Sequence, residues 1–412
     1  MLNMQHWEES SPRFQWRGFM IDESRHFFGK EVVKKLLDAM HFLKLNRFHW
    51  HLVDDQGWRI EIKKFPKLVE IGSKRSASHV KGRLKCKTNS IPHRGYYSQE
   101  EIKEIVKYAK EREIEIVPEI ELPGHCMSAL AAYPNLSCTG GPFEVPVCFG
   151  IKKEIYCAGK EEVFEFLEDV LREIMALFPF EVIHLGGDEV PKERWQECRE
   201  CQKRIKIEEL RDEEDLQGYF TNRIVNFLHE HGKTAMIWNE RYNMSIQKDV
   251  IFQYWHKDEE RMVELLQSGN RFVMSNCSHL YLDYNYRITP LSKTYSFEPV
   301  PPNLEKKYHK NILGIEAPMW TEWTRNEDIL FWHIFPRLIA LAEISWISTN
   351  KKNFNDFLNR LDSISAKLDD LKITYAHREE VEKGFFKRRF SFLTKWTESN
   401  DYYKFRKLKN PD

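Results

Sequence analysis

Short apolar runs alternate with longer amphipathic segments along most of the chain, and this alternation most constrains the fold. Eight runs have the length of buried strands; they cover residues 18–22, 47–53, 114–117, 182–185, 234–238, 250–254, 271–275 and 311–315. Apolar residues at helical spacing mark the segments 30–43, 98–112, 161–177 and 328–344. Strands that alternate with helices usually pair in parallel, because each helix carries the chain back across the sheet.

Eight strands in this pattern predict an α/β fold: a closed (β/α)8 barrel of the TIM type. One or two helices should be degenerate, because the roughly ten residues between the strands at 234–238 and 250–254 are too few for a full crossover helix. The stretch from 276 to Pro302 also lacks helical periodicity. A doubly wound open sheet is the alternative fold.

The barrel is expected to occupy residues 17–350, after a short N-terminal extension over 1–16. Residues 351–412 should add a helix, at 353–371, and a tail that mixes basic and aromatic residues, such as Phe385, Lys387 and Trp396. Such a mixture can bind single-stranded nucleic acid, but a tail packed on the barrel is the preferred interpretation.

Charge and cysteine content restrict partners and location. Lys plus Arg and Asp plus Glu each number 63, so nothing draws the whole chain to nucleic acid or to an acidic membrane. No signal peptide or membrane span is recognised. The eight cysteines are therefore interpreted as reduced thiols of a cytoplasmic protein: Cys86, Cys126, Cys138, Cys148, Cys157, Cys198, Cys201 and Cys277.

No metal or cofactor is expected. Cys198 and Cys201 form a single C-x-x-C pair without a second pair at ribbon spacing, so chance or packing is preferred over zinc. Cys126 follows His125 directly, which suggests a thiol near the pocket that reagents could modify. A homo-oligomer is compatible with the sequence.

Polar or aromatic side chains stand at the C-terminal end of every expected strand, where barrels place their active sites. The most specific of them are Asp188 and Glu189, which follow two glycines. Neighbouring side chains on an extended strand diverge, so the two acids can serve one site only if the glycines let the backbone turn. The alternative is that they cap a following helix, with Pro191 in its first turn.

The sequence HLGGDE at 184–189 resembles the signature of glycoside hydrolase family 20, the β-N-acetylhexosaminidases. Four further motifs resemble that family in its order: DESRH at 22–26, HWHLVDDQGWR at 49–59, PEIELPGH at 118–125 and APMWTE at 317–322. Together they span roughly residues 17–346. The resemblance implies a retaining exo-enzyme that removes terminal non-reducing N-acetyl-glucosamine or N-acetyl-galactosamine residues.

The implied mechanism uses the substrate's own 2-acetamido oxygen as nucleophile and passes through an oxazolinium ion, an exception to the two-carboxylate scheme. Glu189 corresponds to the general acid and base, Asp188 to the residue that orients the acetamide, and Tyr281 to a hydroxyl donor. Asp54 and His125 correspond to neighbours that would hold Glu189 protonated. The implied sugar-binding residues are Arg25, Trp238, Trp255, Asp283, Trp320 and Glu322.

Two other functions are compatible with parts of the pattern. His49 and His51 could belong to a metal-dependent barrel amidohydrolase, although support of the barrel mouth by hydrogen bonds is preferred. A barrel that binds amino sugars without hydrolysing them is the third interpretation, but both acids are present. The sequence departs from many family members, which carry a small α/β domain before the barrel, because only about sixteen residues precede Arg17 here. It also departs because Asn239 follows Trp238 where an acid is common. The long loops at about 73–95 and 277–302 would decide which N-acetylhexosaminide is the natural substrate.

Overall fold

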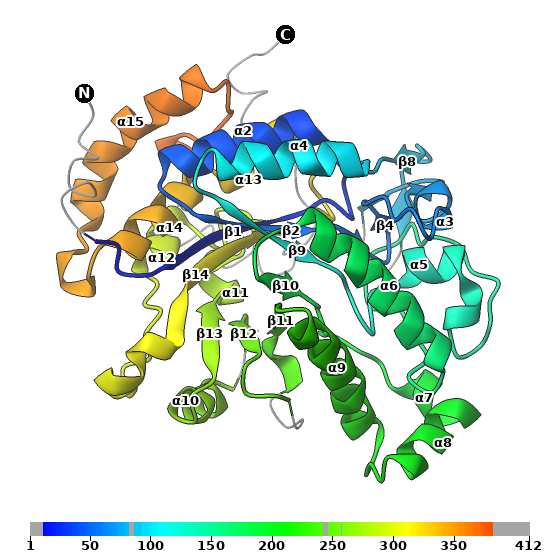
Figure 1. The fold of residues 1–412 in the computed structure, drawn as a ribbon. Coiled ribbons are helices and arrows are strands. Elements are labelled where there is room, and N and C mark those ends of the chain that lie inside the picture. The colour runs from blue at the N-terminus through cyan, green and yellow to red at the C-terminus, as the bar shows by residue number, and fades with distance from the viewer. Residues whose placement is uncertain (1–10, 82–85, 242–245, 257, 382–412) are drawn as a thin grey trace.

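A computed structural model describes residues 11–81, 86–241, 246–256 and 258–381. In this part of the chain eight parallel strands close into a barrel, in the order β1-β14-β13-β12-β11-β10-β9-β2 (Figure 1). The closed barrel confirms the predicted fold, and the open-sheet alternative is wrong. Its strands are β1 (Trp16–Asp22), β2 (Arg47–His51), β9 (Glu115–Glu119), β10 (Val182–His184), β11 (Thr234–Trp238), β12 (Ile251–Tyr254), β13 (Arg271–Met274) and β14 (Ile312–Met319).

Helices cover the outside of the barrel. Those predicted at 30–43, 98–112 and 161–177 begin and end within two residues of the predicted limits, whereas the helices at 213–230 and 259–267 were not predicted. The predicted helix at 98–112 opens with a complete capping box of Ser98 and Glu101. The predicted helix at 328–344 is two helices, because Pro336 lacks the N–H that would continue the first one. The helices are α2 (Lys30–Phe42), α4 (Gln99–Lys110), α6 (Glu161–Leu177), α9 (Glu213–Glu230), α10 (Glu259–Gln267), α13 (Glu327–Ile334) and α14 (Arg337–Trp346).

The second half of the barrel is irregular where the sequence predicts it. Among the described residues between β11 and β12, only a 3-10 turn, η2 (Asn239–Arg241), replaces a crossover helix. After β13 the structure has α11 (Cys277–Leu280) and α12 (Leu291–Ser296), where no helix was expected. Helices of four to six residues are too short to produce a readable apolar period.

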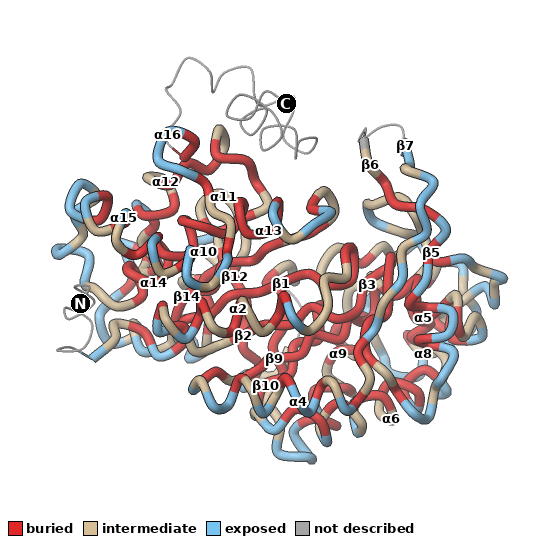
Figure 2. The backbone as a smooth tube through the Cα atoms, turned by 90° about the horizontal axis from the view of Figure 1, so that it is seen from above, coloured by how far each residue is buried: buried red, intermediate tan, exposed pale blue. Residues whose placement is uncertain are grey.

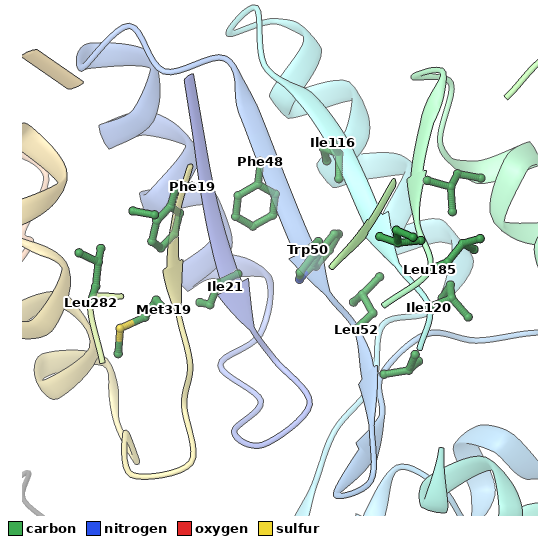
Figure 3. Close-up of a cluster of buried hydrophobic side chains, with 14 of the residues drawn as sticks. Phe19, Ile21, Phe48, Trp50, Leu52, Ile116, Ile120, Leu185, Leu282 and Met319 are labelled. Atoms are coloured by element: carbon green, nitrogen blue, oxygen red, sulfur yellow. The ribbon is translucent and has the colours of Figure 1, made fainter. Parts of the chain in front are cut away.

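Two apolar layers surround the barrel wall. The larger lies between strands and helices, where Phe19, Phe48 and Trp50 pack side by side (Figure 3). Figure 2 shows that the strands of the barrel consist mostly of buried residues. The smaller fills the barrel interior at the N-terminal end of the strands: Trp16, Val117, Val182, Met236, Ile251 and Val273. Side chains two residues further along the strands face the same interior. Most of these side chains are polar, for example Glu119, His184 and Gln253. A cavity can therefore open only at the C-terminal end.

The chain continues past the barrel into α15 (Phe354–Asp370), which is fastened to it. The Arg360 guanidinium donates to both carboxylate oxygens of Glu343 at 2.7 Å, and the rings of Phe357 and Tyr295 stack 4.8 Å apart. The basic and aromatic tail and the first ten residues lie outside the described residues. The predicted domain limits at 16 and 350 and the packing of the tail therefore stay predictions.

Among the described residues, the stretch Glu327–Trp346 is long and apolar enough to cross a membrane. Within this fold 94 % of the window is buried. Apolar helices that are packed in this way are typical of the core of a large barrel.

Candidate active site

A cavity of about 410 Å³ opens at the C-terminal ends of the strands. All of the predicted site residues line it except Asp283: Arg25, Asp54, His125, Asp188, Glu189, Trp238, Trp255, Tyr281, Trp320 and Glu322. The barrel therefore brings together residues that are up to 297 positions apart. This convergence is the main reason to treat the cavity as one functional site.

Asp188 and Glu189 reach the cavity because the chain turns sharply after β10. Gly186 and Gly187 have φ angles of +64° and +94°. A Cβ on Gly186 would lie 1.7 Å from a carboxylate oxygen of Glu121, so a larger residue would have to displace this buried side chain. The predicted turn is present. The capping alternative is wrong, because the next helix, α7 (Glu193–Glu197), has Lys192 at its N-cap.

Glu189 itself holds a strained backbone conformation. Its φ is +49°, and His125 across the site has the same value. Non-glycine residues rarely occupy this left-handed region, and they do so mostly where surrounding contacts fix them. One such contact is visible: the backbone N–H of Glu189 donates to Glu240 at 2.6 Å. Glu240 was not predicted as a site residue, although it follows a predicted strand end.

A chain of alternating bases and acids leads from the barrel interior to the two carboxylates. The His51 Nε2 atom lies 3.2 Å from Asp54 Oδ2, and Asp54 Oδ1 lies 3.3 Å from His125 Nδ1. The Nε2 atom of His125 is 3.7 Å from both Asp188 Oδ2 and Glu189 Oε2. The structure thus places Asp54 next to His125, and His125 next to Glu189.

The predicted effect of that pair on Glu189 is wrong. Burial alone would lower the pKa of His125, but Asp54 raises it well above the ordinary value, so the imidazole is cationic. The close contact with His125 and its charge hold the pKa of Glu189 below the usual value. In the ligand-free site Glu189 is thus ionised, because His125 presents a positive charge rather than a neutral ring.

Asp188 behaves in the opposite way. Burial raises its pKa to about 7; the charge of His125 opposes this shift, and the charges of Glu240 and Glu189 add to it. Between about pH 4 and pH 7 the folded protein therefore binds more protons at Asp188 than the unfolded chain does. Stability from this group falls as the pH rises through that window.

Asp188→Asn should consequently stabilise the protein at pH 8 more than at pH 5. We expect its Tm to exceed that of the wild type by roughly 2 °C or more at pH 8, with a smaller excess at pH 5. Thermal unfolding of both proteins at the two pH values measures the difference. An equal Tm difference at both pH values would show that Asp188 has no raised pKa.

Aromatic side chains form the walls of the cavity. Trp238 and Trp320 have ring centres 5.8 Å apart, and Trp255 and Tyr281 lie nearly parallel at 6.2 Å. Within the described chain, Asp188 Oδ1 and Trp255 Nε1 are buried without a hydrogen-bond partner. Buried polar groups normally have partners, so a ligand with both apolar faces and polar edges suits these walls.

Arg25 stands at another side of the cavity and is firmly oriented. Its guanidinium pairs with Asp54 and, at 3.3 Å, with Asp22, and it donates to Gln56 at 3.0 Å. Its carbon Cζ lies 5.2 Å from the centre of the Trp320 ring. A fixed planar fork of this kind is suited to bidentate contacts with neighbouring hydroxyls.

Asp283 does not line the cavity, although Glu322, whose charge acts on Asp283, does. Burial and the charge of Glu322 raise the pKa of Asp283 well above its usual value. Its Oδ1 atom is buried and has no hydrogen-bond partner among the described residues. Asp283 is half-buried and close enough to Glu322 for their charges to interact, and its predicted contact with the sugar stays a prediction.

Five residues that line the outer part of the cavity were not predicted: His79, Phe149, Gly150, Ile151 and Trp323. The rings of His79, Phe149 and Trp323 pack against one another with centres 4.8–5.4 Å apart. Two of them had a signal: Trp323 follows a recognised motif directly, and His79 lies in the loop at about 73–95 that was expected to decide the substrate. The others stand on a long loop, whose path no periodic pattern reveals.

His49 and His51 support the barrel interior. Both are fully buried, and neither lines the cavity. The Nδ1 atom of His49 lies 2.7 Å from Glu316, its Nε2 atom lies 3.0 Å from Glu119, and His51 also pairs with Glu119. These contacts favour the predicted support of the barrel mouth over the metal-dependent amidohydrolase interpretation.

The sequence left the role of Asn239 open, and the structure shows that its side chain holds the backbone after β12. Its Oδ1 atom accepts from the backbone N–H of Trp255 at 2.6 Å, and its Nδ2 atom donates to the carbonyl of His256 at 2.9 Å. Asn239 thus fixes the end of β12 and with it the Trp255 wall.

Two predictions about cysteines are wrong. Cys86 and Cys148 form a disulfide, so the eight cysteines are not all reduced thiols, and the predicted cytoplasmic location loses its main support and stays a prediction. Cys126 is buried, does not line the cavity, and its pKa is raised well above the usual value by burial. A buried, protonated thiol is a poor target for reagents.

A barrel whose strand ends direct two adjacent carboxylates and several indoles into one cavity has the arrangement of a barrel glycoside hydrolase. Comparison with known proteins agrees: the model of the glycosyl hydrolase family 20 catalytic domain matches residues 14–349. The chain belongs to glycosyl hydrolase family 20.

The relatives are longer than this chain. A β-hexosaminidase of Porphyromonas gingivalis is 38 % identical over 89 % of this chain and 47 % of its own length, and one of Akkermansia muciniphila is 32 % identical over 85 % and 72 %. Among solved structures, a Flavobacterium johnsoniae chitobiase is 36 % identical with a TM-score of 0.77, covering 88 % of this chain and 52 % of its own. The chain thus spans about half the length of some relatives that it matches.

Proposed function

We propose that this chain is a retaining exo-β-N-acetylhexosaminidase that removes terminal non-reducing N-acetyl-glucosamine or N-acetyl-galactosamine by substrate-assisted catalysis. The observation that carries the proposal is the placement of Asp188 and Glu189 together at the cavity, 3.7 Å from one cationic imidazole. Similar proteins agree with the substrate class: a Vibrio harveyi structure described as an exo-β-N-acetylglucosaminidase bound to N-acetylglucosamine has a TM-score of 0.80, with 32 % identity over 89 % of this chain and 60 % of its own.

In this mechanism Glu189 protonates the leaving oxygen and then takes a proton from the attacking water. Its pKa is low in the ligand-free site, yet its side chain is 38 % exposed. A sugar in the cavity would exclude the water that solvates this carboxylate. Loss of solvation raises the pKa of a carboxyl group and shifts Glu189 toward the acid form.

Asp188 and Tyr281 would act on the 2-acetamido group. Asp188 orients the amide so that its oxygen points at the anomeric carbon, and its negative charge stabilises the oxazolinium ion that forms. The buried Oδ1 atom of Asp188 is available to accept from the amide N–H. Tyr281 stays a hydroxyl donor at any ordinary pH, because burial raises its pKa well above the usual value.

The remaining cavity residues would hold the sugar. Arg25 and Glu322 meet its hydroxyls, Trp320 stacks below the ring, and Trp238 and Trp255 enclose the acetamide. The burial of polar atoms beside these rings favours a substrate whose hydroxyls satisfy them. A sugar-binding barrel without hydrolysis is the weaker candidate, because a binding function alone gives no reason for the strained backbone of Glu189.

A panel of nitrophenyl glycosides tests the proposed function. We expect release of nitrophenol from N-acetyl-glucosaminide and N-acetyl-galactosaminide, with the freed sugar first appearing as the β-anomer. Lacto-N-bioside separates exo-cleavage of one residue from release of a disaccharide. Hydrolysis of lacto-N-bioside with neither monosaccharide substrate turned over would contradict the exo-hexosaminidase assignment.

A further inference from the structure

Four cysteines meet in a cluster outside the cavity: Cys138, Cys157, Cys198 and Cys201. Their sulfur atoms all lie within 4.8 Å of one another. The closest pairs are Cys157 with Cys201 at 3.6 Å, Cys157 with Cys198 at 3.7 Å, and Cys138 with Cys201 at 3.8 Å. None of the four lines the cavity, and Cys157 and Cys201 are completely buried.

The cluster joins two excursions from neighbouring strands of the barrel. Cys138 and Cys157 belong to the segment between β9 and α6, where the β-bridge of Ser137 with Tyr156 brings them together. Cys198 and Cys201 belong to the segment between β10 and α9. Cys198 is the N-cap of α8 (Arg199–Ile207), a helix at the edge of the molecule, and Cys201 lies in its first turn (Figure 1).

The sulfur spacing matches a tetrahedral metal site. Four sulfurs at about 2.3 Å from a central Zn²⁺ are about 3.8 Å from one another, whereas bonded sulfurs are about 2.05 Å apart. The three closest sulfur–sulfur distances, 3.6–3.8 Å, agree with the value for sulfurs around one zinc ion. Cys86 and Cys148, by contrast, are bonded in the same structure.

We propose that Cys138, Cys157, Cys198 and Cys201 bind one structural Zn²⁺ ion. Four thiolates fill a tetrahedral shell completely, which is the hallmark of a structural rather than a catalytic zinc site. The inference of this zinc site does not rest on the proposed hydrolase function. The proposal replaces the interpretation of Cys198 and Cys201 as chance or packing. Their proposed partners are not a second C-x-x-C pair, so sequence spacing could not reveal them.

The surrounding backbone is shaped to keep the ligands together. A Cβ on Gly159 would lie 2.1 Å from the backbone of Glu200, so only glycine lets the Cys157 turn approach the start of α8. The guanidinium of Arg194 is close enough to Cys138 for their charges to interact, and it would offset part of the negative charge of a zinc with four thiolates.

The ion would fasten two loops that build the cavity. The wall residues Phe149, Gly150 and Ile151 lie between the first two ligands in sequence, and Glu189 lies shortly before Cys198. Zinc would therefore hold the outer wall of the cavity against the segment that carries the two carboxylates.

Metal analysis of the full chain, produced with zinc in the medium and purified without chelator, tests this site. We expect about one zinc per chain, which a thiol-modifying mercurial releases into a colorimetric zinc indicator. Replacement by Co²⁺ should give the visible and charge-transfer bands of tetrahedral thiolate coordination. These measurements use the unaltered protein and do not depend on activity or on the folding of a variant.

Cys201→Ser and Cys157→Ser should each lose the zinc and lower Tm by roughly 5 °C or more. Cys126→Ser is the matched control, because it removes another buried thiol and should retain the zinc. Protein without bound metal, iron in place of zinc, or four cysteines that prove to be disulfide-bonded after denaturation would each overturn the proposal.

Discussion

Replacing Glu189 by Gln should lower kcat by roughly 10²–10⁴-fold on substrates whose leaving group needs a proton, such as chitobiose. Gln keeps the size and much of the polarity of Glu but can neither donate nor take up the proton. Because the walls and Arg25 are untouched, KM should change little. Steady-state kinetics on chitobiose and on a dinitrophenyl N-acetyl-glucosaminide separate the two steps, since the activated aglycone needs less help to leave.

Glu193→Gln is the control for this variant. Glu193 is an exposed residue of α7, four positions after Glu189, and its replacement should leave kcat unchanged. A Glu189→Gln enzyme that cleaves chitobiose at the rate of the wild type would exclude Glu189 as the general acid.

The second large effect concerns the substrate. Removal of the 2-acetamido group should abolish nearly all hydrolysis, because the proposed mechanism assigns the attack on the anomeric carbon to the substrate's amide and not to a protein carboxylate. An intramolecular nucleophile held in line contributes a large rate advantage, and we expect a loss of roughly 10³-fold or more in kcat/KM. The loss should lie mainly in kcat, since the amide helps the reaction more than it helps binding.

Asp188→Asn should reduce this discrimination. An asparagine can still orient an amide, but it cannot offset the positive charge that the oxazolinium ion develops. The acetamido substrate should therefore lose most of its advantage, whereas the already slow unacetylated substrate should lose little. The contrast separates an electrostatic role of Asp188 from a general loss of folding, which would lower both rates.

The fold could be predicted because its determinants are local. Each strand and each long helix carries its own apolar period, and the helix at 161–177 was placed without error. The predictions failed where an element is too short or too uniform to show its limits, and where residues distant in the sequence pair. The short helices α11 and α12 carry too few turns for a period, and the break at Pro336 divides a segment that is apolar throughout.

The cavity was predictable to the extent that its residues stand on strand ends. Trp238 follows a strand period, so its place at the mouth follows from the barrel alone. Phe149 stands on a long excursion that only the folded chain brings to the rim. Charge was harder still: the pKa of Glu189 depends on the state of His125, which depends in turn on Asp54.

The cysteines show the same limit. Cys86 pairs with Cys148 across 62 positions of the sequence. The four-sulfur cluster takes its ligands from two separate segments, one after β9 and one after β10, and these two strands are neighbours in the barrel. The C-x-x-C spacing reveals Cys198 and Cys201, but nothing in the spacing of the sequence identifies Cys138 and Cys157 as their partners or pairs Cys86 with Cys148. Both depend on how long loops fold over the barrel.

The most direct measurement compares kcat/KM for nitrophenyl N-acetyl-β-glucosaminide with that for the matching β-glucoside, in the wild type and in Asp188→Asn. The account predicts a ratio of roughly 10³ or more in the wild type and a ratio much nearer to one in the variant. Equal hydrolysis of the two glycosides by the wild type would contradict it, because the nucleophile would then have to come from the protein.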